Sequence, residues 1–294
     1  NAKLEAAGAG AIVLKSLFEE QIMMEADRLR NPSYYPEGSD YLAEYIRNHK
    51  LAEYLELIKE SKKVCTIPVI ASINCYTDAE WVDFAKQIEE AGADALEINI
   101  LALQSDIQYK YGSFEQRHID ILSHIKKTIR IPVIMKLGSN FTNPVALIDQ
   151  LYANGAAAVV LFNRFYQPDI DVEKMEHTSG DVFSNASDLS TTLRWIGISS
   201  SLVSKIDYAA SGGIHKPDGI VKAILAGASA IEICSAIYQN TNLFVGEMNR
   251  FLSAWMERKG FKHISQFKGK LNAKDVEGIN MFERTQFLKY FSEK

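Results

Sequence analysis

Polar residues of a few kinds close or interrupt the apolar runs of this sequence. They are two lysines and three asparagines: Lys15, Lys136, Asn74, Asn99 and Asn163. Two lysines that face one opening need an anion to offset their repulsion. Asparagine amides donate and accept hydrogen bonds, so several together suit a polar, planar ligand. A single lysine at a strand end usually reaches toward solvent, and a single asparagine there usually caps a turn. Only their occurrence at several strand ends indicates a ligand site.

Two short turns of small residues have the composition of a phosphate site. They are Ser211-Gly212-Gly213 and Cys234-Ser235, and the first leads into a helical pattern (SGGIHKPDGIVKAI). Backbone N–H groups converge where a glycine turn meets a helix N-terminus, and such groups bind phosphate. The turns therefore predict a site for a phosphorylated ligand.

Other site chemistries have less support in the sequence. No histidine pair or carboxylate cluster follows a predicted strand, so we expect no metal site. No Asp or Glu is expected to end a strand, which disfavours hydrolysis by paired carboxylates. The six histidines fall on predicted helices or loops and are expected at the surface. A phosphorylated cofactor suits the remaining residues better than an acid–base pair does.

An internal repeat predicts the elements that position these residues. One phrase occurs four times: GAGAIVLK from Gly8, GADALEIN from Gly92, GAAAVVLF from Gly155 and GASAIEIC from Gly227. A second phrase, written IPVIASIN, IPVIMKLG and KIDYAASGG, alternates with it. Amphipathic stretches such as AEWVDFAKQIEEA and PDGIVKAILA separate the phrases. The pattern predicts seven parallel strands that alternate with helices.

Seven strands that alternate with helices predict an α/β fold, the TIM (β/α)8 barrel. Because eight strands close such a barrel, we expect its first strand to precede Asn1. The chain begins without methionine inside a helical pattern (NAKLEAA), which is the helix expected after that strand. Chemistry in such barrels lies at the carboxyl ends of the strands, and the loops after strands seven and eight often hold a phosphate. An open doubly wound sheet is the alternative. We expect residues 1–294 to form one domain, with active-face insertions at 17–50 and 164–187 and a helical tail at 263–294.

Composition narrows the class of protein. The chain is 47% hydrophobic and 23% charged, which supports a sizeable core. Its 32 basic and 37 acidic residues give a net charge of −5 without a basic run, which argues against nucleic acid or an anionic membrane as partner. Three scattered cysteines fit a reducing compartment. No apolar run reaches the roughly 20 residues that span a bilayer, so we expect a cytoplasmic protein.

Several strings resemble the FMN-binding barrel of the dihydroorotate dehydrogenase family. They are ASINCYTDAEWVDFAKQIEEAGADALEIN, IPVIMKLGSN, AASGGI and AILAGASAIEICSAI. The strings are similar to those of the class I cytosolic enzymes and of the flavin domain of dihydropyrimidine dehydrogenase. The resemblance implies FMN as cofactor, a small-molecule substrate, a separate electron acceptor and a homodimer. It also implies oxidation of dihydroorotate, or of a similar cyclic CH–CH substrate, to orotate in pyrimidine biosynthesis.

The resemblance also implies roles for individual residues. Lys15, Asn99 and Asn163 match positions that contact both flavin and substrate. Lys136 matches the lysine near the flavin N1–C2=O edge, where a cation stabilises the anionic reduced ring. The other expected flavin contacts are Ser16, Asn74, Ser211, Gly212, Gly213, Cys234 and Ser235, with Ser184 and Asn185 as further candidates.

Two departures from the family pattern concern the substrate. After strand four the family has N-x-S-C-P-N with the cysteine as catalytic base, whereas this chain reads NILALQ and has Ala102 at that position. After strand two, NPSYYPEGSDYLAEY replaces the family loop N-S-M-G-L-P-N. An alanine methyl accepts no proton, so the base is unknown. Ser105, Tyr109 and Tyr111 are candidates, although each needs activation to accept a proton near neutral pH.

Three alternatives stay open at this point. One is a flavin enzyme that acts on a different unsaturated ring or enone. Another is an FMN-binding relative without turnover. The third is a class I aldolase in which Lys15 or Lys136 forms a Schiff base.

Overall fold

The computed structural model describes residues 1–18, 37–75 and 81–275 of the chain. By their internal packing they divide into two compact units. The first comprises Asn1–Met135 with Asn154–Ala156, and the second comprises Lys136–Ala153 with Ala157–Lys294. Each unit is described by itself below.

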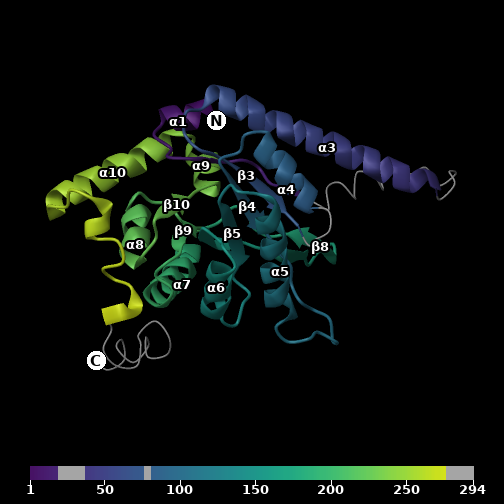
Figure 1. The fold of residues 1–294 in the computed structure, drawn as a ribbon. Coiled ribbons are helices and arrows are strands. Elements are labelled where there is room, and N and C mark those ends of the chain that lie inside the picture. The colour runs from purple at the N-terminus through teal and green to yellow at the C-terminus, as the bar shows by residue number, and fades with distance from the viewer. Residues whose placement is uncertain (19–36, 76–80, 276–294) are drawn as a thin grey trace. The chain divides into compact units, whose positions relative to one another are not determined.

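The first unit contains short parallel strands, and most of their apolar side chains are buried. β1 (Ile12–Val13) and β2 (Leu17–Phe18) both pair with β3 (Val69–Asn74), which pairs with β4 (Ala95–Asn99) (Figure 1). Every residue of β4 is buried, as expected for a parallel strand that is covered on both faces. The helices of this unit are α1 (Ala2–Ala6), α3 (Glu37–Val64), α4 (Trp81–Glu90) and α5 (Ser113–Thr128).

Helix α4 shows why the amphipathic stretches become helices that cover the strands. Its buried residues are Trp81, Phe84, Ala85 and Ile88. Their spacing of three and four places them on one face of a helix, and the intervening charged residues face solvent. The predicted helix at this position is confirmed.

Helix α5 buries a histidine that the sequence did not mark as a core residue. His118 is fully buried, and its Nδ1 lies 2.8 Å from the carbonyl oxygen of Phe114. The prediction that the histidines lie at the surface is therefore wrong for His118, because it falls on the apolar face of the helix with Phe114 and Ile121. Burial lowers the pKa of His118 to about 4, so the ring is neutral at pH 7.

This buried ring predicts a specific pH dependence of stability. Unfolded chains protonate histidine near pH 6.5, whereas native His118 takes up its proton only near pH 4. The free energy of unfolding should therefore fall by about 3 kcal/mol between these pH values. His118→Gln should flatten that decline in urea unfolding, whereas His124→Gln, an exposed histidine on the same helix, should not. Parallel loss in wild type and His118→Gln would contradict the assignment.

The second unit continues the strand–helix succession. β6 (Ala158–Asn163) pairs in parallel with β9 (Asp207–Ser211), which pairs in parallel with β10 (Ala230–Glu232). β5 (Val133–Gly138) begins in the first unit and ends in the second. The α-helices are α6 (Pro144–Ala153), α7 (Leu189–Leu202), α8 (Asp218–Ala226), α9 (Ser235–Asn240) and α10 (Leu243–Lys259). Short 3₁₀ turns are η1 (Ala186–Asp188), η2 (Ile264–Gln266) and η3 (Ala273–Asp275).

The predicted alternation of strands and helices is confirmed in the described residues. Strands occur at all seven repeat phrases, and a helix occurs at each amphipathic stretch between them. The amphipathic stretch LAEYLELIKESKK (51–63) lies within α3, which begins upstream of it at Glu37. The barrel strand expected before Asn1 stays an expectation.

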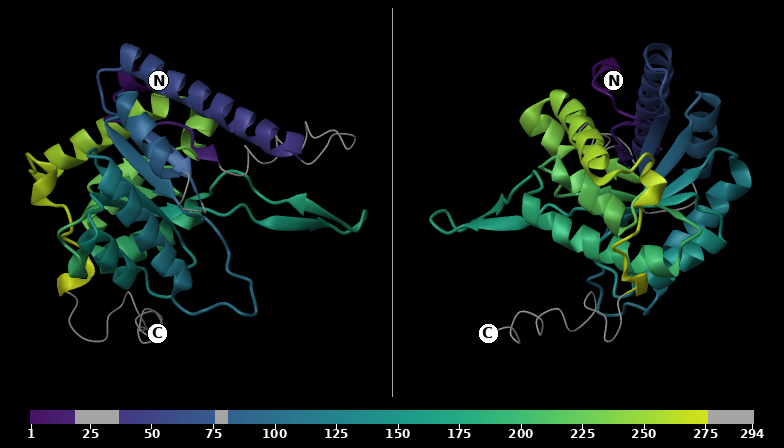
Figure 2. Two further views of the ribbon diagram at one scale, coloured as in Figure 1. Left: turned by 45° about the vertical axis from the view of Figure 1, so that its right-hand side comes forward. Right: turned by 90° about the vertical axis from the view of Figure 1, so that its left-hand side faces the viewer.

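The predicted insertion at 164–187 contains an antiparallel hairpin. Its strands are β7 (Pro168–Asp171) and β8 (Glu176–Ser179), and Figure 2 shows it extending away from the helices of its own unit. Of the insertion at 17–50, only 17–18 and 37–50 are described, and the predicted closing helix of the tail lies outside the described residues.

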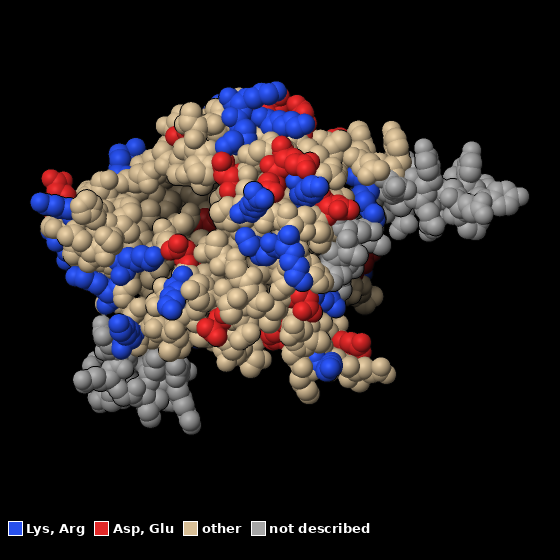
Figure 3. All heavy atoms as spheres, in the orientation of Figure 1, with Lys and Arg blue, Asp and Glu red and all other residues tan. Residues whose placement is uncertain are grey.

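The described surface carries charges of both signs. Basic and acidic side chains are intermixed on the face drawn in Figure 3. Among the described residues, no helix combines the length and apolar character that crossing a membrane requires.

Candidate functional site

Most of the predicted strand ends are where the sequence placed them. β3 ends at Asn74 and β4 at Asn99, and these two residues lie opposite each other in the parallel pair. β6 ends at Asn163 and β9 at Ser211. The carboxyl ends of these strands therefore carry polar side chains, as expected for a barrel active face.

Three strand ends differ from the prediction. β1 ends at Val13, before Lys15 and Ser16. β5 runs to Gly138, so Lys136 lies within the strand rather than at its end. β10 ends at Glu232, before Cys234 and Ser235. The expectation that no acidic residue ends a strand is therefore wrong. The sequence alone could not show that β10 stops at a carboxylate, because IEIC continues the apolar run on both sides of it.

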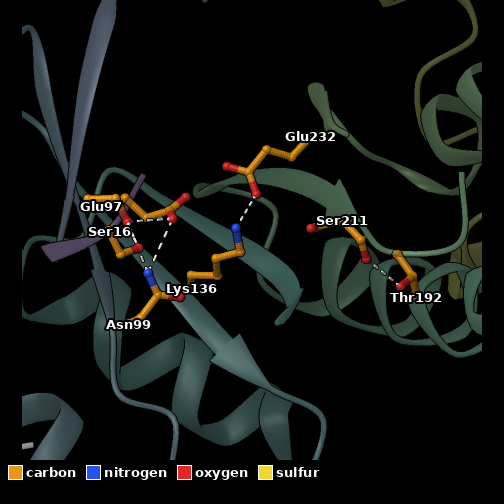
Figure 4. Close-up of polar contacts among 8 residues, drawn as sticks. Ser16, Glu97, Asn99, Lys136, Thr192, Ser211 and Glu232 are labelled. Atoms are coloured by element: carbon orange, nitrogen blue, oxygen red, sulfur yellow. Dashed lines mark hydrogen bonds and ion pairs between the residues drawn. The ribbon is translucent and has the colours of Figure 1, made fainter. Parts of the chain in front are cut away.

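A buried hydrogen-bond network in the first unit holds Asn99. Ser72 is at its centre, since its Oγ lies 2.7 Å from Ser16 Oγ and 3.1 Å from Glu97 Oε1 (Figure 4). Asn99 Nδ2 donates to Ser72 Oγ at 3.2 Å and to Glu97 Oε1 at 3.3 Å. Ser72 has one proton, which goes to the carboxylate, so it accepts from Ser16 and Asn99. The network thereby fixes the orientation of the Asn99 amide.

Tyr54 of helix α3 supports the same network from the backbone side. Its hydroxyl donates to the Ser72 carbonyl at 2.9 Å and accepts from the Ser72 N–H at 2.7 Å. Burial raises the pKa of Tyr54, and the nearby charge of Glu97 adds to that rise, while the bond to Ser72 opposes it. Tyr54 therefore stays a neutral structural bridge between α3 and β3.

Sequence reasoning missed Glu97, Ser72 and Tyr54. A signal for Glu97 was present, because GADALEIN and GASAIEIC both have glutamate at the fifth residue after the glycine, at Glu97 and Glu232. A charged residue inside an apolar strand phrase needs a partner when it is buried. Both glutamates have one in the structure, in separate units.

The predicted flavin, substrate and base residues of the first unit differ in exposure. Lys15 follows β1 and is exposed, whereas Asn74 is buried. Ala102 lies in the irregular segment after β4, where Ser105 and Tyr111 are exposed. The hydroxyl of Tyr109 donates to Glu115 Oε2 at 3.4 Å. The base candidates among these residues stay predictions.

An ion pair in the second unit joins Lys136 of β5 to the end of β10. Lys136 Nζ lies 2.6 Å from Glu232 Oε2, and the two side chains are 17% and 19% exposed (Figure 4). Glu232 is the register partner of Ser211 on β9. The pair therefore lies beside the strand end that leads into the predicted phosphate turn.

The glycine turn after β9 has a backbone conformation that favours glycine at two successive positions. Gly212 and Gly213 have φ values of +90° and +74°, which favour glycine. A Cβ on Gly213 would lie 2.1 Å from the backbone nitrogen of Leu189, whereas a Cβ on Gly212 would meet only the Phe162 carbonyl oxygen, at 3.9 Å. Gly213 thus allows the first residue of α7 to pack closely against it, and Gly212 leaves open space at the end of β9.

Ser184 ties the predicted turns of the second unit together. Its N–H donates to Ser235 Oγ at 3.1 Å, and its Oγ lies 2.9 Å from His215 Nε2. Arg164, which follows β6, donates to the Phe183 carbonyl at 2.9 Å. The loops after β6, β9 and β10 are therefore connected through the segment around Ser184, which the sequence marked only as a further candidate.

The second unit holds polar groups of the kinds that bind phosphorylated ligands. Ser184 joins the hydroxyl of Ser235 and the imidazole of His215, and Lys136, paired with Glu232, is a cation of the same unit. This set suits a phosphate monoester joined to a ring that gains negative charge. Within the described residues, no group of three or more metal-ligating side chains gathers.

Comparisons with known proteins agree with this arrangement. The family model for dihydroorotate dehydrogenase matches residues 27–256. The catalytic subunit of dihydroorotate dehydrogenase B (NAD(+)) from Thermoplasma volcanium is 26% identical over 89% of this chain and 86% of that protein. Its counterpart from Methanocella arvoryzae is 28% identical over 88% and 85%. Dihydroorotate dehydrogenase A (fumarate) from Lactobacillus delbrueckii is 24% identical over 74% and 71%.

A solved structure shows the fold. The dihydroorotate dehydrogenase of Eimeria tenella in complex with ferulenol superposes with a TM-score of 0.58 at 13% identity, over 75% of this chain and 66% of that chain. This similarity supports the α/β TIM barrel over the open sheet. Because the family model spans well over half of the residues, this chain belongs to the dihydroorotate dehydrogenase family of flavin-dependent dehydrogenases.

Proposed function

We propose that the chain binds FMN and oxidises dihydroorotate, or a similar cyclic CH–CH substrate, in pyrimidine biosynthesis. The observation that supports this most strongly is the set of loops tied by Ser184, with the open turn at Gly212 between them. FMN, unlike a flavin without phosphate, would use those donors. Bound FMN would supply the hydride acceptor for the oxidation of the substrate.

The residues of the chain would bind and orient the reactants. Ser184, Gly212, Gly213 and Ser235 would hold the phosphate, with Ser211 and Cys234 beside them. Lys136 would place its ammonium near the ring. The remaining proposed contacts are Lys15, Ser16, Asn74, Asn99 and Asn163.

The Asn99 amide is the best supported of these contacts in the first unit. Because Ser72 and Glu97 fix its nitrogen, its orientation is set before a ligand arrives. Preorganised amides orient a substrate without the entropy cost of being ordered on binding.

The electron acceptor and the assembly are part of the proposal. Relatives of this chain are named for NAD(+) and for fumarate as acceptors, so either could reoxidise the flavin here. A homodimer and a cytoplasmic location remain expectations from the resemblance and the composition.

A spectrum and a reduction experiment test the proposal. The protein loaded with FMN should absorb near about 450 nm and bleach when dihydroorotate is added without oxygen. FMN should bind about tenfold more tightly than riboflavin if the loops around Ser184 hold the phosphate. Absence of bleaching between about pH 6 and pH 9 would remove dihydroorotate as the substrate. Equal affinity for riboflavin would remove the phosphate site.

A second candidate function is a flavin-binding relative with another substrate or with no turnover. Ala102 at the position of the family's base favours it, and so does the exposure of Ser105 and Tyr111. Bleaching by another cyclic donor, with dihydroorotate inert, would support the different substrate.

An aldolase that uses Lys136 is less compatible with the geometry. A Schiff-base lysine must present a neutral amine, whereas the Glu232 carboxylate at 2.6 Å stabilises the ammonium form of Lys136. Borohydride trapping with a carbonyl substrate should therefore leave Lys136 unmodified.

A further inference from the structure

The cation proposed to serve the flavin ring already has an anionic partner in the chain. Lys136 and Glu232 are both more than four-fifths buried, and 2.6 Å separates their charged atoms. A hydrogen bond between two ionised groups at this distance is among the stronger polar contacts in proteins. Separating it without replacing the partner would leave a buried charge uncompensated.

Glu232 is placed so that its charge acts on the proposed ring site. It ends β10, lies opposite Ser211 of β9, and precedes the turn at Cys234 and Ser235. The end of the neighbouring strand β9 and the turn that follows Glu232 are thus the ones assigned to the phosphate. The side chain of Glu232 contacts Lys136, the lysine assigned to the ring. The sequence alone assigned no function to Glu232.

Electrostatics gives the sign of its effect. Reduction by two electrons and one proton turns neutral oxidised flavin into an anion, so an unpaired lysine stabilises the reduced form more than the oxidised form. A carboxylate bound to that lysine offsets part of the positive charge. It therefore lowers the preference of the site for reduced flavin, and with it the electron affinity of the flavin.

We infer that Glu232 is a positioning residue that holds Lys136 as an internal counter-ion and lowers the electron affinity of the flavin bound beside it. The inference rests on the proposed function, because it needs a flavin at the strand ends. It concerns a residue of this chain that touches Lys136, and it assigns Glu232 no contact with the substrate.

Glu232→Gln tests the inference because glutamine keeps a hydrogen-bond acceptor for Lys136 and removes the charge. The readouts are the dissociation constants of oxidised and reduced FMN and the two-electron reduction potential. The ratio of reduced to oxidised affinity should rise about tenfold, which corresponds to roughly 30 mV for a two-electron couple. Glu232→Asp keeps the charge and should stay closer to wild type.

A double-mutant cycle shows whether the effect passes through Lys136. In a Lys136→Met background, Glu232→Gln should change the ratio by much less than it does alone. Asp171→Asn removes a carboxylate from an exposed ion pair with Lys174 in the hairpin of the same unit, and it should leave the ratio unchanged. Circular dichroism of each variant checks the fold. If Glu232→Gln does not fold, Glu232→Ala removes the same charge and should raise the ratio in the same direction.

The outcomes separate this inference from the proposed function. FMN binding with an unchanged ratio in Glu232→Gln, or an equal change with and without Lys136, would overturn the role of Glu232 and leave the proposed function intact. A wild-type protein that binds no FMN would overturn both.

Discussion

Lys136→Met should lower the free energy of unfolding by about 3 kcal/mol, even in protein without flavin. The substitution leaves the Glu232 carboxylate largely buried with its paired cation removed, and removing one member of a buried ion pair destabilises a fold by several kcal/mol. Because both side chains keep about one-fifth of their exposure, we expect the lower part of that range. Urea unfolding followed by circular dichroism measures the change.

The double variant Lys136→Met with Glu232→Gln isolates the cause. Removing the second charge should restore most of the lost stability, since the penalty comes from the isolated carboxylate rather than from the lost hydrogen bond. Lys174→Met is the matched control, because its ion pair with Asp171 is exposed and such pairs contribute less than about 1 kcal/mol. If the double variant were as unstable as Lys136→Met, packing of the lysine stem would be the explanation instead.

The repeat made most of the secondary structure predictable. Four copies of one phrase and three of another placed seven strands, because near-continuous apolar runs after a glycine turn have few alternatives to a buried parallel strand. The amphipathic stretches predicted the helices because their apolar residues fall on one helix face, and the buried face of α4 shows this. The start of helix α3 at Glu37 was missed, although Leu42, Tyr45 and Ile46 have the spacing of one helix face and Ile46 is buried.

The sequence predicted which residues lie at several strand ends. It did not predict which side chains contact each other. Asn99 and Ser211 follow from where apolar runs stop. The partner of Lys136 is 96 residues away along the chain, and the contact arises only when two parallel strands bring it there. Ser184 is similar, because a loop with no periodic pattern carries it to Ser235. Burial of His118 depended on which side of α5 faces the strands, which its spacing from Phe114 could have shown.

Gly213→Ala should destabilise the second unit strongly. A Cβ at this position would lie 2.1 Å from the Leu189 nitrogen and 2.8 Å from its Cα, so the start of α7 must move. The backbone also has a φ of +74°, which costs a non-glycine residue about 1 kcal/mol or more before any clash. We expect a loss of about 3 kcal/mol in the free energy of unfolding, or several degrees in the thermal midpoint.

Gly212→Ala is the matched substitution at the neighbouring residue, and it should act on binding instead. Its φ of +90° costs a similar strain, but its Cβ would meet only the Phe162 carbonyl oxygen at 3.9 Å, so the fold should lose only about 1 kcal/mol. The methyl would enter the open side of the turn, where the phosphate of FMN is proposed to lie. FMN affinity should therefore fall about tenfold or more while riboflavin affinity changes little. Equal losses for FMN and riboflavin would show that the open side of Gly212 does not face the phosphate, whereas equal stability losses in the two alanine variants would show that α7 does not depend on Gly213.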